Sequence, residues 1–171
     1  MRQLLQQLLS VTKSIEVDLR AVGNIPQEGK LPRSSQVVPF ALVRGTRGYL
    51  EKLAHQINGA YENGWFDAAA VMTRRLLETL IIEVFEKHGI GSRIQGRNGD
   101  FLYLSDLISK CLSETTWNLS RNTKRALPRL KDIGDKSAHS RRYNAIKQDV
   151  DILLPDLRVT IQEMVYLAGL K

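Results

Sequence analysis

The sequence has 171 residues, of which 43% are hydrophobic and 6% aromatic, and its formal net charge is +7. This length and composition are typical of one globular domain with an aliphatic core. The single cysteine, Cys111, excludes an internal disulfide and a zinc site built from several cysteines of one chain. We therefore expect a reduced, cytoplasmic protein that holds neither a metal nor another cofactor.

The first twenty residues favour an amphipathic helix over a signal peptide. Residues 2–20 carry leucine, valine and isoleucine at helical spacing, and Gln6 and Gln7 interrupt the apolar run. The longest apolar stretches fall far short of the ~20 residues that cross a bilayer, so we expect no membrane association. The helix must bury its leucines on its own domain, on a second copy or on another protein.

The division of the chain follows from composition. Residues 21–45 are rich in proline, glycine and serine, which predicts a linker arm. We therefore expect an N-terminal helix and arm over 1–45 and a helical domain over 46–171.

Apolar spacing predicts the elements of the second part in chain order. Pro128 interrupts the pattern near residue 130, and a proline deep in a helix is disfavoured, so we expect a break there. Pro155 either bends the last helix or marks its first turn. The prediction is an all-α bundle of four to five main helices. Helices are expected over 46–62, 66–88, 101–113 and 147–168, with a short helix over 119–126, a new one from Pro128 to 138, and a glycine-rich basic loop at 89–99.

Positive charge is concentrated in one part of the sequence. Residues 110–147 hold ten Lys or Arg and three acids, so the rest of the chain is close to neutral. Clustered positive charge indicates an anionic partner such as RNA or DNA, and the alternative is a solvated surface. The candidate anion-binding or nucleic-acid-binding residues are Arg74, Arg121, Lys124, Arg125, Arg129, Lys136, Arg141 and Arg142.

Two small residues, Gly134 and Ala138, lie four apart near the end of the predicted helix and so share a face. A helical glycine costs about 1 kcal/mol relative to alanine, which predicts close packing of another helix there. His139 follows, with Arg141 and Arg142 beside it. This helix end is either an anion site or a set of basic residues that complements the helix dipole.

Arg74 and Glu78 lie four apart within the apolar arc of the helix predicted at 66–88. A buried charge must be paired, so one interpretation is an ion pair that fixes how helices pack. The other is that Arg74 points into a cleft near His139 and binds an anion. No spacing of the histidines, and no arrangement of Ser, Cys, His and Asp, predicts a metal site or a nucleophile.

One set of residues, spread over roughly residues 50–168, carries a family resemblance. It comprises Ala68, Arg74 to Glu78, Tyr103, Leu104, Leu107, Ile108, Leu130, Ile133 to His139, Asp149 and Leu154. This part of the chain resembles domain-of-unknown-function family 4145, which in turn resembles the HEPN helical domains of bacterial defence and toxin systems. The resemblance implies an α-helical bundle, often a homodimer, from a prokaryotic defence, restriction or mobile-element setting.

The resemblance also bears on catalysis. HEPN ribonucleases carry an Arg-Asn-x3-His motif, and the matching residues here are Gly134, Asp135 and His139. Glycine cannot neutralise a scissile phosphate, so we expect a non-catalytic module that binds nucleic acid or a protein. The alternatives are a metal-independent endoribonuclease that uses His139 with Arg74 or Arg141, and an antitoxin-like or structural subunit. In the non-catalytic reading Glu78, Gly134, Asp135 and Ala138 are structural.

Overall fold

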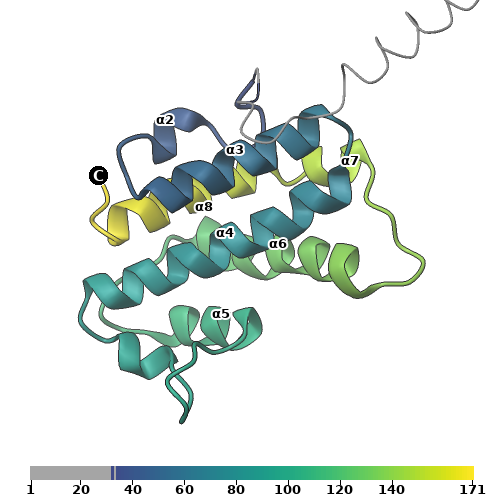
Figure 1. The fold of residues 1–171 in the computed structure, drawn as a ribbon. Helices are drawn as coiled ribbons and strands as arrows, with labels where there is room; N and C mark the ends of the chain where they lie inside the picture. Colours follow the sequence, from purple (N-terminus) through teal and green to yellow (C-terminus); the bar gives the residue numbers. More distant parts are fainter. Residues whose placement is uncertain (1–31, 33) are drawn as a thin grey trace, which may run out of the picture. The chain divides into compact units, whose positions relative to one another are not determined.

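The computed structural model describes residues 32 and 34–171, and these belong to a unit that begins at Pro32. The helix predicted over 2–20 lies outside the described residues. The elements in chain order are α2 (Phe40–Val43), α3 (Gly48–Glu62), α4 (Phe66–Lys87), a short 3₁₀ helix η1 (Gly91–Ile94), α5 (Leu104–Ser113), α6 (Arg121–His139), α7 (Lys147–Asp151) and α8 (Leu154–Leu167) (Figure 1). The predicted all-α class is confirmed for this part of the chain, whose extended backbone pairs at a single bridge, Gln95 with Phe101.

The core is built around α4, which contacts α3, α5, α6 and α8. Its sequence is apolar on almost every side, as expected of a central helix. Leu76, Leu80, Ile81 and Phe85 are all fully buried. Figure 1 shows α3 and α8 on one side of α4, α5 on the other, and α6 alongside it.

The segment that precedes α3 is part of this core, although the sequence predicts a linker there. Val37, Val38 and Val43 are buried. Asn58 of α3 accepts hydrogen bonds from the backbone N–H groups of Val37 and Val38, both at 3.0 Å, and donates to the Val38 carbonyl at 2.8 Å. The side-chain amide of Asn58 thus supplies the hydrogen-bond partners that a helix or strand would otherwise give to this irregular segment. The described part of the predicted linker therefore packs on α3.

The predicted break at Pro128 is wrong, because α6 runs without interruption from Arg121 to His139. Pro128 and Lys124, whose carbonyl the proline leaves without its usual helical donor, are both exposed. Ala126, Leu127 and Leu130 are buried on the opposite side of the helix. Their packing holds α6 together on both sides of the proline.

The predicted helix over 147–168 is divided into α7 and α8, and Pro155 lies in the first turn of α8. Proline is tolerated there because the first N–H groups of a helix have no intrahelical acceptor. No helix in the described part of the chain is both long enough and apolar enough to cross a membrane.

Candidate nucleic-acid interface

Helix α6 separates its apolar and basic residues onto two faces. Thr123, Ala126, Leu127, Leu130 and Gly134 are buried against the bundle. The predicted basic residues of this helix lie on the other side and are exposed. They are Arg121, Lys124, Arg125, Arg129 and Lys136.

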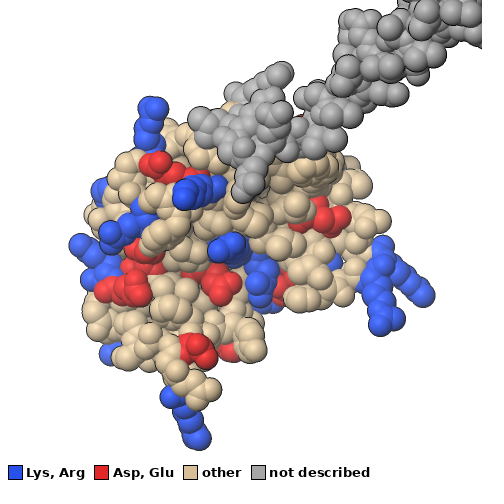
Figure 2. Space-filling model, viewed as in Figure 1, with Lys and Arg blue, Asp and Glu red and all other residues tan. Residues whose placement is uncertain are grey.

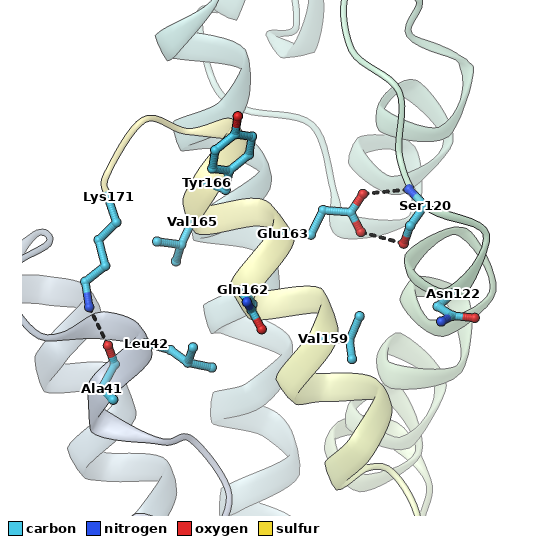
Figure 3. Close-up of a pocket in the computed structure, with 10 residues that line it drawn as sticks. All are labelled: Ala41, Leu42, Ser120, Asn122, Val159, Gln162, Glu163, Val165, Tyr166 and Lys171. Carbon is cyan, nitrogen blue, oxygen red and sulfur yellow. Dashed lines mark hydrogen bonds between the residues drawn. The ribbon is translucent and has the colours of Figure 1, made fainter.

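A carboxylate of α8 anchors the first turn of α6. Ser120 caps the helix by accepting from the Thr123 backbone N–H at 3.2 Å. Glu163 accepts from the Ser120 backbone N–H and hydroxyl, both at 2.6 Å (Figure 3). It also accepts from the Thr123 hydroxyl. Burial opposes ionisation of Glu163, but these hydrogen bonds outweigh it and lower its pKa. The helix end that carries Arg121, Lys124 and Arg125 is therefore fixed in place.

Gly134 lies where α6 crosses α4. A Cβ atom at this position would stand 2.7 Å from Arg74 Cβ and 3.1 Å from the Ala70 carbonyl oxygen. The glycine therefore permits the close approach of two helices that the sequence predicts. Ala138 is exposed and takes no part in this contact, because one more turn carries α6 beyond the buried surface.

Arg74 is held across this crossing by Asp135. Its Nε lies 2.8 Å from Asp135 Oδ1, and its Nη1 lies 3.8 Å from Glu78 Oε2. The three side chains are 26–34% exposed rather than enclosed by an apolar arc. Lys131 pairs with the second oxygen of Asp135. Burial raises the pKa of Asp135, but the two cations outweigh burial and leave it below its ordinary value.

These contacts divide the predicted anion-binding residues into two groups. Arg74 is paired with Asp135, and Arg129 is paired with Asp156 of α8 at 2.7 Å. The remaining residues are exposed, and none makes an ion pair within the part of the chain that the structure describes. We call this set the α6 basic surface: Arg121, Lys124, Arg125, Lys136, Arg141 and Arg142.

Two of these cations follow the end of α6, where His139 is the last helical residue. Arg141 and Arg142 lie in the loop between α6 and α7 and are exposed. Figure 2 shows basic side chains projecting into solvent at the edge of the molecule where this loop lies in Figure 1. The α6 basic surface thus extends from the first turn of α6 into the loop.

The residues around this surface that could support catalysis or hold a metal are His139, the acidic side chains and Cys111. His139 is exposed, and its side chain has no hydrogen-bond or ion-pair partner among the described residues. Within residues 32 and 34–171, no three His, Cys, Asp or Glu side chains gather where they would hold a metal ion. Burial raises the pKa of the Cys111 thiol to about 12, so this cysteine is a poor nucleophile.

The sequence interpretation missed the acids that organise the site. Glu163 and Asp156 are not singled out by the sequence interpretation, because they are ordinary acids of an amphipathic helix. Asp149 enters it only through the family resemblance. Their partners are separated from them by up to 43 residues, as for Ser120 and Glu163.

Comparison of the chain with protein-family models, with curated proteins and with solved structures found no match. The resemblance to family 4145 and to HEPN domains therefore stays a hypothesis.

Proposed function

We propose that this protein is a non-catalytic helical module that binds the phosphate backbone of nucleic acid through the α6 basic surface. The observation that carries the proposal is the set of six exposed cations without ion-pair partners in the described structure. Cations at the crossing of α4 and α6 are paired, as Arg74 of α4 and Lys131 of α6 are with Asp135. Six exposed cations without an ion pair in the described structure thus lie along the solvent-facing side of α6 and in the loop that follows it.

The length of this surface favours a polymer over a small anion. Arg121 and Lys136 are fifteen residues apart on one helix, a separation of about 22 Å at 1.5 Å per residue. A single phosphate or carboxylate contacts one end of such a surface, whereas a nucleic-acid strand offers phosphates along its whole length. Phosphate contacts of this kind bind without reading sequence.

The non-catalytic part of the proposal rests on two features. Gly134 occupies the position that the resemblance assigns to a phosphate-neutralising arginine, and its contact with Arg74 leaves no room for a larger side chain. Arg74, the nearest alternative, is engaged by Asp135. Three further parts of the proposal rest on the sequence alone. They are a homodimer, a protein partner bound through residues 2–20, and a defence, restriction or mobile-element setting.

The test is a binding titration with fluorescently labelled single-stranded RNA and duplex DNA at several salt concentrations. The variant is the triple substitution Arg121→Gln, Lys124→Gln and Arg125→Gln. The control is Arg44→Gln, Lys52→Gln and Arg97→Gln, which removes the same charge from exposed positions on other elements. Each phosphate contact that is lost lowers the slope of log affinity against log salt by roughly 1.

We expect a slope reduced by roughly two to three for the α6 triple variant and little change for the control. Equal effects of both triples would mean that net charge, and not this surface, drives binding. RNA cleavage by the wild type that disappears in His139→Ala would replace the proposal with the ribonuclease alternative. Failure to bind RNA or DNA even at low salt would refute the proposal and favour a protein partner.

A further inference from the structure

The loop that carries Arg141 and Arg142 has no regular structure, yet it is tied down at both ends. Residues 140–146 connect α6 to α7. At the near end, the Ser140 backbone N–H donates to the Lys136 carbonyl at 3.0 Å, which continues the hydrogen bonding of α6. Arg141 and Arg142 come directly after this anchored residue, so the position of the pair also depends on how the far end of the loop is held.

Two carboxylates hold that far end. Asp149, in the first turn of α7, accepts from the Tyr143 hydroxyl at 2.9 Å and from the Ile146 backbone N–H at 3.0 Å. Asp67, in the first turn of α4, accepts from the Ala145 backbone N–H at 2.9 Å. Three hydrogen bonds to charged acceptors thus fix residues 143–146, and such bonds are stronger than neutral ones.

The Tyr143 hydroxyl remains a hydrogen-bond donor to Asp149 throughout the neutral pH range. Burial and the neighbouring Asp149 carboxylate raise its pKa to about 12, so the phenol stays protonated and donates at neutral pH. Ala145 is 8% exposed, which shows that this half of the loop lies against the bundle. Arg141 and Arg142 are therefore an exposed pair between two anchored points.

An anchored pair of cations binds differently from a mobile one. A flexible loop occupies many conformations, and the apparent affinity of a ligand falls with the fraction of molecules in the competent one. Holding the loop in advance removes this cost without adding a contact to the ligand. The hydrogen bonds around Tyr143 have this consequence for any anion that Arg141 and Arg142 contact.

We propose that Tyr143, Asp149 and Asp67 form a latch that holds Arg141 and Arg142 ready to bind adjacent phosphates of a nucleic-acid strand. Tyr143 is in this view a positioning residue, and it acts through the two arginines. The inference rests on the proposed function, because it assumes that the α6 basic surface binds nucleic acid. It goes further by assigning the phosphate contacts at the end of α6 to a preformed loop.

The test compares Tyr143→Phe with the double variant Arg141→Gln and Arg142→Gln, using a labelled 20-nucleotide single-stranded RNA as the probe. Tyr103→Phe is the matched control, since Tyr103 is 81% exposed and its hydroxyl has no hydrogen-bond partner among the described residues. Amide hydrogen exchange over residues 140–146 is measured on the same proteins, together with their melting temperatures.

Tyr143→Phe is expected to weaken RNA binding about two- to tenfold, the effect of one hydrogen bond on the population of the competent loop. The slope of log affinity against log salt stays at the wild-type value, because the bound state keeps all of its cations. Exchange over residues 140–146 accelerates while the rest of the bundle is unchanged. The double arginine variant instead lowers the slope by roughly two, and Tyr103→Phe behaves like the wild type.

The possible failures are distinct. If the arginine variant weakens binding and Tyr143→Phe does not, the latch is refuted and the proposed function stands. If Tyr143→Phe lowers the salt slope as well, the tyrosine affects the contacts themselves and the positioning role is wrong. If the arginine variant binds like the wild type, the loop contacts no phosphate and the latch is refuted. If the wild type binds no RNA, the proposed function and the latch both fail.

Discussion

At the scale of single residues, the crossing of α4 and α6 depends on the absence of a side chain at Gly134 and on the ion pair between Arg74 and Asp135. Gly134 supplies no side chain where Arg74 Cβ and the Ala70 carbonyl approach. One position along, Asp135 binds Arg74 and Lys131 with its two oxygens. The same helix turn therefore brings α4 close and neutralises the cation that this approach would otherwise leave half-buried.

Gly134→Ala is expected to destabilise the fold by about 1–3 kcal/mol, because the new methyl group overpacks the contact with Arg74 and Ala70. This loss exceeds the gain of up to about 1 kcal/mol that alanine brings to a helix. Gly59→Ala in α3 is the control, since its Cβ would meet nothing within 4 Å. In urea unfolding, equal stabilisation by both substitutions would contradict close packing at Gly134.

Asp135 is expected to make stability depend on acid pH. Its pKa in the folded protein lies below the ordinary value of 3.8. The carboxylate therefore stabilises the fold at neutral pH, and this contribution is lost as the pH falls below that value. Urea unfolding at pH 7 and pH 3 should show a smaller pH-dependent loss for Asp135→Asn than for the wild type. Asp132→Asn, at an exposed position of α6 without an ion pair in the described structure, should match the wild type.

At the scale of elements, α6 shows how packing overrides local preference. Pro128 removes one helical hydrogen bond in the interior of α6, which by itself favours two shorter helices. Leu127 and Leu130 are fully buried on either side of it. Burying such side chains is worth about 1.5–3 kcal/mol each, which together equals or exceeds the cost of about 3 kcal/mol for an interior proline.

Pro128→Ala is therefore expected to stabilise the protein by about 1–3 kcal/mol, because alanine restores the donor to the Lys124 carbonyl. Part of the gain is offset by the greater freedom of the unfolded chain. Pro155→Ala is the control, since Pro155 lies in the first turn of α8, where its missing N–H costs little. Thermal unfolding at one pH compares the two, and a lower melting temperature for Pro128→Ala would contradict this account of α6.

At the scale of the whole molecule, segments far apart in the chain are joined by single polar side chains. Asn58 binds the backbone of Val37 and Val38 to α3. Glu163 joins α8 to the start of α6, and Asp67 joins α4 to the loop before α7. The basic surface therefore depends on the assembled bundle and not on α6 alone.

Asn58→Ala is expected to cost about 3 kcal/mol or more, because it leaves buried backbone groups of Val37 and Val38 without partners. Asn63→Ala is the control, since Asn63 is exposed and its side chain makes one hydrogen bond in the described structure, to the Gly59 carbonyl. Urea unfolding measures both. A loss for Asn58→Ala no larger than that for Asn63→Ala would mean that residues 37 and 38 are not integral to the core.

The sequence by itself determined the all-α class and the bounds of α3, α4 and α5 to within three residues, because the spacing of apolar residues is a local property that shows which face each helix buries. It also located the concentration of positive charge. Only the tertiary structure decided that α6 continues through Pro128, that residues 37–43 join the core and that Arg74 and Arg129 are paired. These outcomes depend on partners such as Asn58, Asp135 and Asp156, whose proximity in space arises from the packing of whole helices and leaves no periodic trace in the sequence.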